Sequence, residues 1–255
     1  MTRAPMITEF ADQSIIEAGI LENPYFILLR SGNMNLESFK VSQEQFYHAV
    51  NFFPRPMAAL IARIPSARTR LDILHNLVEE HGEFDEQAFH CTTFKRFLAS
   101  LESKKPLSGQ PIPEMSAAVH AFNSVLLAAC ALDEVETGIA CLGIIEHSFA
   151  HIAAMIGRAV VQNGWVPPEK LVHYRLHAEI DERHAEEFYA AIEASYSDGS
   201  KKASIEQGIR LGLYAFNNLY LSLSETASAA KPEHRLPDNV LKFTPALAEQ
   251  ERQWQ

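Results

Sequence analysis

Apolar residues recur with a period of about 3.6 along almost the whole chain, which is the period of an amphipathic α-helix. Strand signals are scarce, because no segment alternates apolar and polar side chains over several positions and no Asn-Gly or Asp-Gly hairpin joins two apolar runs. A chain of 255 residues, 47% of them apolar, can bury a sizeable core. The pattern therefore predicts an all-α protein folded as a single bundle of roughly seven to eight helices.

Proline, glycine and capping residues predict where these helices begin and end. The first helical segment is interrupted near Asn23-Pro24, and Ser42 resembles the start of a capping box that opens a helix to Ile64. Ser66 is expected to cap the following helix, which Gly82 should end. Further helices are predicted to span Phe89–Leu101, Glu114–Leu132, the Asp133–Glu136 capping box to Gln162, Pro167–Tyr196 and Ser204–Ser228.

The domain organisation predicted from these segments is simple. Lys104–Pro113 is the one clear linker, with three prolines, but it is too short to mark a domain boundary. Residues 1–230 are expected to form one helical domain. Residues 231–255 contain three prolines and little periodicity, so they are expected to form an extended C-terminal tail.

The composition excludes some classes of partner. The chain has 32 acidic and 22 basic residues and a net charge of −10, without the basic block of a nucleic-acid-binding protein. Its three cysteines have no CxxC spacing and its N-terminus has no apolar signal-peptide run. No uninterrupted apolar run approaches the length of a membrane span. These features predict a cytoplasmic protein that binds no nucleic acid and has no membrane span.

The stretch HYRLHAEIDERHAEEF, residues 173–188, has ionisable side chains where a helix normally buries apolar ones. His177, Asp181 and His184 fall at positions i, i+4 and i+7, on one helical face that continues into apolar residues on both sides. A buried carboxylate is costly unless it is paired, hydrogen-bonded or bound to a metal, and metal binding relieves that cost for all three groups. A solvated face is the alternative, and His173 could take the place of His177.

Three more ionisable side chains lie on apolar helix faces. Glu146 is an isolated carboxylate in the apolar interior of its predicted helix. Glu79 and Glu80 are adjacent, so only one of them can face inward, and the spacing from Leu77 favours Glu80. His90 is in line with two phenylalanines and is also expected to face inward.

These positions form one candidate set of metal ligands: Glu80, His90, Glu146, His177, Asp181 and His184. Three carboxylates and three imidazoles exceed what one ion needs and suit two, and this mixture of donors suits iron, manganese or zinc. Helical bundles build dinuclear iron or manganese sites from inward-facing Glu and His side chains. The repeated Glu-x-x-His motif of ferritin-type bundles is absent, so a different bundle is implied.

Other residues and other functions remain as alternatives. Cys141 lies close to Glu146 in sequence and could act as a nucleophile, with the six residues then forming the polar pocket of a metal-free enzyme. His147 and His151 are interpreted as helix-packing groups or as supports for a ligand. A helical protein that only binds a partner is the third hypothesis, and it is disfavoured because a buried array of acids and histidines without a ligand is costly.

At these residues the chain resembles the haem-oxygenase-like diiron oxidases and oxygenases. That branch shares its all-α fold with the thiaminase-type, TenA-like proteins and with pyrroloquinoline-quinone synthase. The matching pieces are the run Asn76-Leu-Val-Glu-Glu80 followed by Gly82, then His90, Glu146 and the His-x-x-x-Asp-x-x-His run from His177. Their order and approximate separations also fit, and the resemblance covers residues from about 10 to 228.

The resemblance implies two iron ions, replaceable by manganese, with O2 as co-substrate. Such enzymes activate O2 through a peroxo-diferric intermediate and oxidise a small amine, amino acid or fatty acid, by N-oxygenation, desaturation or oxidative C–C cleavage. An external electron donor and a homodimer are compatible with this family. Glu80, Glu146 and Asp181 would be the catalytic carboxylates. The ligands would be Glu80, His90 and bridging Glu146 for the first iron, and Glu146, His177, Asp181 and His184 for the second.

The chain departs from the family pattern in two places. Some members have a further carboxylate from the preceding helix, but here Pro54 and Pro56, which should kink that helix, occupy the region and Glu44 is the nearest acid. The branch that makes p-aminobenzoate from its own tyrosine needs a lysine near the site, where this chain has Ile156 and Arg158. The same fold also allows the alternative of a metal-free TenA-like hydrolase or a cofactorless oxidase.

The sequence does not identify the substrate, beyond predicting that it is a small molecule. A cavity lined by aromatic residues would favour an apolar or aliphatic substrate, although the same residues are equally suited to the core. The candidate lining residues are Phe52, Phe53, Phe149 and Phe216.

Overall fold

The computed structural model describes residues 5–101 and 112–229, and every regular element within these ranges is helical. The all-α prediction is therefore confirmed. The predicted tail at residues 231–255 and most of the Lys104–Pro113 linker lie outside the described residues. In chain order the α-helices are α1 Pro5–Ala18, α2 Pro24–Arg30, α3 Leu36–Phe52, α4 Pro54–Arg63, α5 Ala67–Glu80, α6 His90–Ser100, α7 Ala117–Ala131, α8 Val135–Gln162, α9 Val172–Ser197 and α10 Lys202–Ala229.

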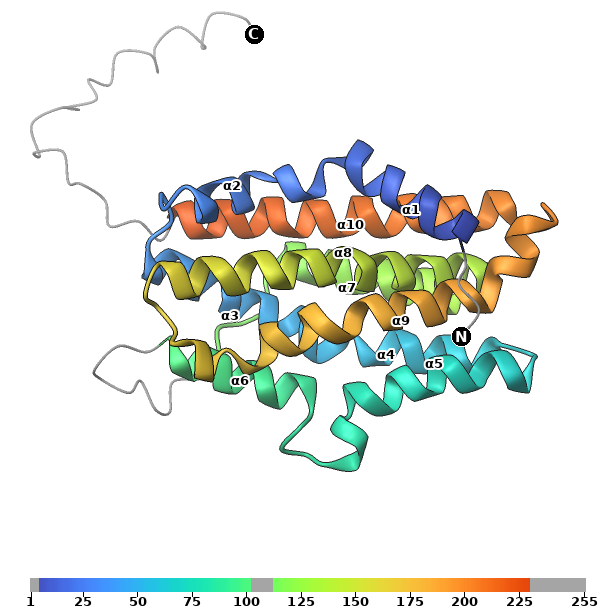
Figure 1. Cartoon of the computed structure of the whole chain (residues 1–255), viewed down its shortest axis with the longest axis horizontal. Helices are drawn as coiled ribbons and strands as arrows, with labels where there is room; N and C mark the ends of the chain where they lie inside the picture. Colours follow the sequence, from blue (N-terminus) through green and yellow to red (C-terminus); the bar gives the residue numbers. More distant parts are fainter. Residues whose placement is uncertain (1–4, 102–111, 230–255) are drawn as a thin grey trace, which may run out of the picture.

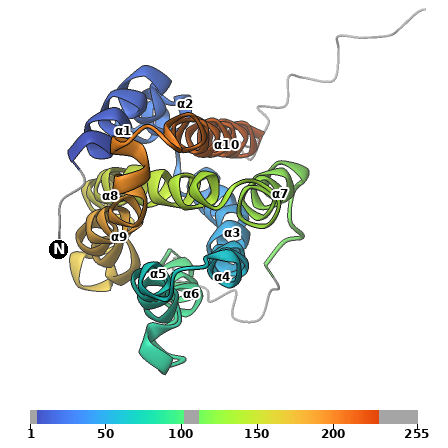
Figure 2. The ribbon, with the colours of Figure 1, turned by 90° about the vertical axis from the view of Figure 1, so that its right-hand side faces the viewer.

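Helix α8 lies at the centre of the bundle, with the other helices arranged around it (Figures 1 and 2). Its most extensive contacts are with α9 and α10. In the end-on view, α10 and the α1–α2 pair lie on one side of α8, whereas α4, α5 and α6 lie on the opposite side (Figure 2). The side chain of Glu146, near the middle of α8, is therefore enclosed by protein.

The same helix passes a test for membrane spans that depends only on length and composition. In the described part of the chain, Val135–Gln162 is the helix that passes it, but 83% of its most apolar window is buried inside the bundle. A helix that is apolar on all sides is typical of the core of a large helical protein.

Two glycines allow α10 to approach α8 closely. A Cβ atom built on Gly208 would lie 2.3 Å from the carbonyl oxygen of Thr137, and one built on Gly212 would lie 2.4 Å from Cγ2 of Ile144. Because protein interiors are close-packed, a larger residue at either position would push the two helices apart. One turn after Gly212, on the same face, Phe216 enters the core.

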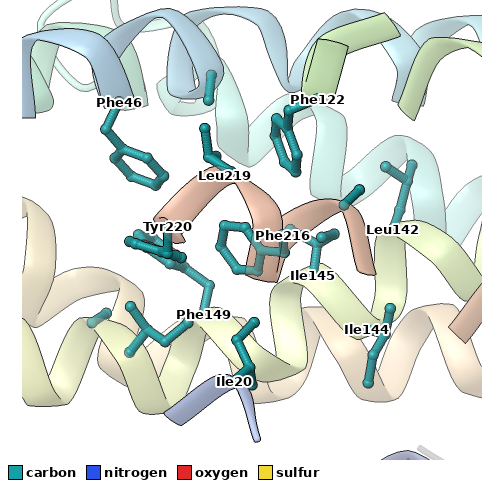
Figure 3. Packing of buried hydrophobic residues seen from close by; sticks show 14 of the residues in the cluster. Ile20, Phe46, Phe122, Leu142, Ile144, Ile145, Phe149, Phe216, Leu219 and Tyr220 are labelled. Atoms are coloured by element: carbon teal, nitrogen blue, oxygen red, sulfur yellow. The ribbon is translucent and has the colours of Figure 1, made fainter. Parts of the chain in front are cut away.

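Aromatic rings fill the space between α3, α7, α8 and α10 (Figure 3). The ring of Phe46 lies 5.6 Å from that of Tyr220 and 5.7 Å from that of Phe149, measured between centroids. Phe122 stacks on Phe216 at 5.7 Å. Aromatic pairs at these separations add to the stabilisation that burial alone provides. This cluster, called the aromatic wall below, is therefore a well-packed part of the core.

Two predicted helix caps are wrong. Helix α3 begins at Leu36 rather than at Ser42, because the Asn35 side chain accepts a hydrogen bond from the backbone N–H of Ser38. The hydroxyl of Ser42 instead donates to a backbone carbonyl inside the helix. Helix α8 begins where predicted, but its N-cap residue is Glu134 and no side chain caps it.

Other predicted boundaries are confirmed. The Ser66 side chain accepts a hydrogen bond from the backbone N–H of Thr69 at 3.2 Å and so caps α5. The kink expected at Pro54 is present: α3 ends at Phe52 and α4 begins at Pro54, with Phe53 between them in helical conformation. Asn23 caps α2 through its side chain, with Pro24 as the first helical residue.

Candidate metal centre

Four helices supply the six predicted ligands. Glu80 is the last residue of α5 and His90 the first residue of α6, so the turn between these helices sets their separation. Glu146 lies near the middle of α8, and α9 supplies the other three. All six residues are buried, with exposed fractions between 0% and 5%. The structure therefore brings the whole predicted set into the interior of the bundle.

Three of the side chains, from Glu146, Asp181 and His184, bring donor atoms close together. Nδ1 of His184 lies 3.8 Å from Oδ1 of Asp181 and 3.8 Å from Oε2 of Glu146. One donor atom from each of these residues lies within 4.8 Å of the other two. Metal–ligand bonds of about 2.0–2.2 Å place the donors of one ion roughly 3–4 Å apart. The spacing thus suits a shared metal ion after a small contraction.

The remaining three candidates lie directly beside this group. Nδ1 of His177 lies 2.9 Å from Oδ1 of Asp181, one helical turn away. Nδ1 of His90 lies 3.0 Å from Oε1 of Glu80. The rings of His90 and His177 meet edge to face with their centroids 4.5 Å apart. The cluster is therefore continuous from α5 to α9, and these three residues add donor atoms that a second ion could use.

An unusual turn joins α5 to α6 and sets the position of Glu80 relative to His90. Gly82 has a φ of +55°, and a Cβ atom at this position would lie 2.5 Å from the carbonyl carbon of Ala88. Glu83 and Phe84 also have positive φ values, of 51° and 73°. Positive φ is uncommon outside glycine, and such strain persists only where the surrounding structure enforces it.

The adjacent acids Glu79 and Glu80 have different surroundings. The side chain of Glu79 is 18% exposed, whereas that of Glu80 is 4% exposed. Glu79 accepts a hydrogen bond from Nε2 of His184 at 2.9 Å and another from Arg183 at 2.7 Å. Glu79 therefore holds the outer side of the His184 ring, so that Nδ1 of this ring faces the cluster. This geometry favours Glu80 as the ligand and gives Glu79 a supporting position.

The sequence did not reveal the residues that support Glu79 from outside the cluster. Arg183 donates to Glu79 and also to Oε1 of Glu187, at 3.1 Å, so one guanidinium links two carboxylates beside the centre. Glu187 is itself buried, with 3% of its surface exposed. The i, i+4 spacing of Arg183 and Glu187 is a sequence signal that could have revealed the pair.

Burial and mutual charge shift the pKa values of the clustered groups in opposite directions. Burial opposes the charge of Glu80, but His90 together with His177 and His184 outweighs it and lowers the pKa of Glu80 to about 2. Burial and the charge of Asp181 raise the pKa of Glu146 to about 7, and burial raises the pKa of Asp181 well above its usual value. Although burial opposes its charge, the pKa of His184 rises to about 10 because of Glu146 and the other acids. Without metal, Glu146, Asp181 and His184 thus retain protons more readily than usual, and a bound cation would have to displace these protons.

The donor atoms of the cluster fit a metal because several of them have no other partner. Among the described residues, Oε1 of Glu146, Nε2 of His177 and Nδ1 of His184 are buried without a hydrogen bond. Buried polar atoms are normally hydrogen-bonded, so a group of unpaired ones calls for a ligand. Nitrogen and carboxylate donors in this mixture suit iron or manganese.

His173 belongs to the wall of the centre rather than to the cluster itself. It is fully buried, and its ring centroid lies 4.3 Å from that of His177. Its Nδ1 is 3.1 Å from the hydroxyl oxygen of Thr93. Burial, with the charges of His177 and His90, lowers the pKa of His173 well below its usual value, so the ring is neutral. Its role as a substitute for His177 stays a hypothesis.

A cavity adjoins the cluster on the side of the aromatic wall. Four polar residues line it, namely Glu80, Glu146, His173 and His177, and its other lining residues are apolar. The apolar residues are Phe46, Ala49, Val50, Phe53, Phe122, Ile145, Phe149 and Phe216. Of the predicted aromatic lining, Phe52 is not among them; its ring instead lies under the Arg55 guanidinium.

Other candidates from the sequence lie away from this site or lack the required chemistry. Cys141 is fully buried, and burial raises the pKa of its thiol to about 12, so it is not poised as a nucleophile. His147 links helices, since it lies 3.2 Å from Asp12 of α1 and 3.3 Å from the Tyr189 hydroxyl of α9. Glu44 pairs with a lysine on its own helix at 3.9 Å.

The chain matches a known protein family over most of its length. Residues 42–217 match the sequence model of a family described as iron-containing redox enzymes. The matched range includes all six residues of the candidate centre. The match agrees with the all-α fold.

Similar proteins of known name and known structure fall in the same group. A 4-aminobenzoate synthase from Chlamydia muridarum is 26% identical over 213 residues, which cover 82% of this chain and 88% of that protein. One from Nitrosomonas europaea is 24% identical, over 76% of this chain and 81% of that protein. A CADD-like protein of unknown function from Nostoc punctiforme has a TM-score of 0.70 at 15% identity, over 88% of this chain and 98% of that one. A TenA homologue from P. horikoshii has a TM-score of 0.62 at 16% identity, over 88% and 99%. At these identities the solved structures show the fold alone.

Proposed function

The chain belongs to the family of iron-containing redox enzymes with the haem-oxygenase-like fold, and from this membership we propose that it is a non-haem diiron oxidase or oxygenase. Oxidoreductase activity follows from the family. The two iron ions, O2 as co-substrate and a small organic substrate are the proposal. The proposed ligands are Glu80, His90, Glu146, His177, Asp181 and His184.

One observation carries this proposal. Six buried acids and histidines from four helices converge on one space, and three of their atoms lack a hydrogen bond among the described residues. A single ion needs about four protein donors or fewer when it keeps an open position for a substrate. Six residues with mixed nitrogen and oxygen donors therefore support two ions with open positions between them.

Iron, when bound, would supply the electron-transfer and O2 chemistry that side chains cannot supply. The chain's own residues do the rest. Glu79 and Arg183 fix the orientation of His184, which a ligand ring requires. The aromatic wall, with Phe46 and Phe149 facing the cavity, excludes water from the reacting groups.

The metal-free alternative receives less support from the same geometry. A cysteine-dependent hydrolase needs a thiolate with a base beside it. Cys141 is fully buried and its thiol pKa is raised to about 12, so its reactive form is disfavoured. A cofactorless enzyme would also have to maintain several buried, unpaired polar atoms without a ligand, which is costly.

A second candidate function is the formation of 4-aminobenzoate, because the curated relatives carry that name. In that branch the enzyme oxidises one of its own tyrosines. A buried chain of polar groups favours this candidate here. Tyr174, whose ring packs against His173 and Phe149, donates to Gln43, and Gln43 donates to the hydroxyl of Tyr25 at 2.8 Å. Among the described residues that line the cavity, however, none is a lysine.

The location, assembly and electron supply belong to the same proposal. The described cysteines, Cys91, Cys130 and Cys141, are all free thiols, which suits the reducing cytoplasm. An external electron donor would supply the electrons that the oxidation of the substrate requires. A homodimer would be compatible with the fold.

The test of the proposal is iron stoichiometry followed by reaction with O2. The protein is loaded anaerobically with ferrous iron, freed of excess metal and analysed for iron per chain, then mixed with O2 in a stopped-flow spectrometer. We expect two irons per chain and a transient visible absorption band. His184→Ala should lose iron while its helical circular dichroism is unchanged, and the exposed His120→Ala should retain both irons. Full iron occupancy in His184→Ala would refute the proposed ligand set, and manganese loading tests the substitution.

The second candidate is tested on the same iron-loaded protein. After reaction with O2 and a reductant, but without any added substrate, mass spectrometry would detect free 4-aminobenzoate and a matching loss of mass from the chain. Tyr25→Phe and Tyr174→Phe identify the residue consumed. If the chain mass does not change and no 4-aminobenzoate forms, the protein oxidises an external substrate instead.

A further inference from the structure

The cavity beside the centre is lined mainly by apolar side chains. Among the described residues, its wall contains three candidate metal ligands, His173 and eight apolar side chains. No lysine, arginine, serine, threonine, asparagine or glutamine contributes to this described wall. A charged group in such a cavity would have no partner other than the metal ligands, and an unpaired buried charge is costly.

His173 is the one polar residue in this wall that is outside the candidate ligand set. Its ring is held on several sides: its centroid lies 4.8 Å from that of Phe94 and 5.4 Å from that of Tyr174. Thr93 contacts its Nδ1 at 3.1 Å. Its Nε2 is buried and has no hydrogen-bond partner among the described residues. The ring is therefore fixed in place while one of its two nitrogen atoms is unused.

The contact with Thr93 determines which nitrogen carries the proton. The Thr93 hydroxyl has a single hydrogen, which it donates to the backbone carbonyl of His90 at 2.9 Å. Its oxygen can then only accept from His173, so Nδ1 is the protonated nitrogen and Nε2 carries a free lone pair. Outside the candidate metal ligands, the described wall of the cavity thus contains one hydrogen-bond acceptor among apolar side chains.

We propose that Nε2 of His173 accepts a hydrogen bond from an uncharged O–H or N–H group of a largely apolar substrate. This inference rests on the proposed function, because it assigns a substrate class to the cavity of the proposed diiron centre. His173 is then a residue that determines specificity and orientation. A primary alcohol, a phenol or an aniline fits this class, whereas a free amino acid, with two charges, does not.

The apolar wall and the acceptor would act together on orientation. The aromatic rings bind the apolar body without fixing its rotation, whereas a single hydrogen bond to His173 fixes one end. Because His173 precedes His177 by one helical turn, the bound end lies beside the cluster. A site built to hydrogen-bond a substrate group rejects analogues that lack it, since its own polar atom is then left unpaired.

The test uses isosteric probes that differ in one donor group, on metal-free protein. NMR titration measures the affinity of phenol and toluene, and of the more slender pair 1-butanol and pentane. His173→Phe should weaken phenol or 1-butanol binding about three- to tenfold, because one hydrogen bond is lost, and leave toluene or pentane within about twofold. Val50→Leu, a change of shape only, should affect both members of a pair equally.

A second measurement does not depend on the stability of any variant. In wild-type protein labelled with nitrogen-15 at histidine, two-bond correlations report which nitrogen of His173 is protonated. We expect the Nδ1–H form in the wild type, and Thr93→Val should reduce the preference for it. An Nε2–H form in the wild type would overturn the inference, as would donor probes whose affinity does not change in His173→Phe, or the absence of binding by all four probes.

Iron analysis separates this inference from the proposed function. His173→Phe should retain the wild-type number of irons, and loss of iron from this variant would make His173 a ligand and overturn its assigned role. Because the probes are titrated without metal, donor discrimination can hold even if the wild type binds no iron. In that case the diiron proposal fails and the acceptor role of His173 survives.

Discussion

Asp181 illustrates at the residue scale what this centre costs the protein without metal. Its side chain is fully buried, and burial raises its pKa well above the value it has in an unfolded chain. A carboxyl group whose pKa is raised by folding destabilises the native state at every pH above its unfolded pKa. On folding, the group must either take up a proton from solution or bury its negative charge, and both cost free energy. The destabilisation therefore grows as the pH rises above the unfolded pKa and is complete only above the folded pKa, so it decreases as the pH falls from neutral toward the unfolded pKa.

Replacing this charge should stabilise the metal-free protein and abolish metal binding. We expect Asp181→Asn to raise the free energy of unfolding of the metal-free protein at pH 7 by roughly 1–3 kcal/mol. The amide can still accept a hydrogen bond from His177, so no new cavity forms. Urea unfolding measures the change, and iron analysis should show loss of metal. Glu179→Gln, an exposed change on the same helix, is the control and should be neutral. A destabilised Asp181→Asn would mean that the charge is well paired in the native state.

The neighbouring pair Glu79 and Glu80 yields a second prediction at this scale. Glu79→Leu should weaken iron binding about 10- to 100-fold by releasing the outer side of the His184 ring, without removing a ligand. Glu80→Gln should abolish binding of one iron. Competition with a chelator measures both affinities. His75→Gln, at an exposed residue 3.4 Å from Glu79, should have little effect. The opposite ranking, with Glu79 essential and Glu80 dispensable, would exchange their roles.

The sequence predicts the clustered residues better than their supports. The i, i+4, i+7 spacing of His177, Asp181 and His184 requires only a helix, and the helix is present. The contact between Glu79 and Arg183 joins α5 to α9, and the relative rotation of those two helices cannot be read from either segment alone. Iron binding by the six residues stays a prediction.

At the scale of elements, the turn between α5 and α6 controls the centre. Sequence reasoning placed the end of α5 at Gly82 because glycine tolerates positive φ, and the helix ends two residues before it. The same reasoning failed for α3, where Ser42 matched a capping pattern but Asn35 provides the cap. Capping patterns occur inside helices as well, and only the packing of the preceding segment decides between them.

A substitution at Gly82 should therefore disturb metal binding from a distance. Gly82→Ala combines an unfavourable φ with a Cβ atom 2.5 Å from the carbonyl carbon of Ala88, so the turn must shift and Glu80 must move relative to His90. We expect about 1–3 kcal/mol of destabilisation and weaker iron binding, measured by urea unfolding and chelator competition.

Gly199→Ala is the matched control for this turn. Gly199 also has a positive φ, of +78°, but a Cβ atom there would have nothing within 4 Å, and the residue lies between α9 and α10. It should show the cost of the backbone conformation with unchanged iron affinity. Equal loss of iron affinity in both variants would mean that general destabilisation, rather than the geometry of the α5–α6 turn, is responsible.

At the scale of the whole molecule, the proposed metal ions would join helices that are distant in the sequence. The candidate ligands come from α5, α6, α8 and α9, and in the end-on view α5 and α6 lie below α8 and α9 (Figure 2). A ligand that binds only the native state stabilises it by about 2.7 kcal/mol at one hundred times its dissociation constant. Metal should thus stabilise the fold as a unit rather than one local segment.

Iron removal should show this directly. We expect the anaerobic ferrous protein to unfold at a higher temperature than the chelator-treated protein, with slower amide hydrogen exchange in α5, α6 and the middle of α9. The reason is that opening any of these helices would require release of the metal. Asp181→Asn, which should not bind iron, is expected to show no difference between the two conditions. Protection confined to α9 would argue for a smaller site on that helix alone.

The scale of the whole molecule is also where sequence prediction reached its limit. Helix periodicity was sufficient for an all-α bundle, but the cavity depends on how helices are rotated against each other. Phe53, Phe149 and Phe216 line it as expected, whereas Phe52, adjacent to Phe53, does not. Adjacent helical residues face directions about 100° apart, so a small error in rotation exchanges one for the other.

The buried charges of the cluster also bear on how such a sequence drifts over generations. Because folding raises the pKa of Asp181 and Glu146, these two acids lower the stability of the metal-free chain, and a lineage that no longer needs metal gains stability from a neutral replacement at either position. Loss of the centre would be favoured by selection for folding alone, and the emptied interior would remain beside an apolar cavity. Conversely, retention of all six residues in a descendant chain is a record of continued selection for binding. The presence or loss of these acids and histidines in related chains therefore indicates whether metal binding is still under selection.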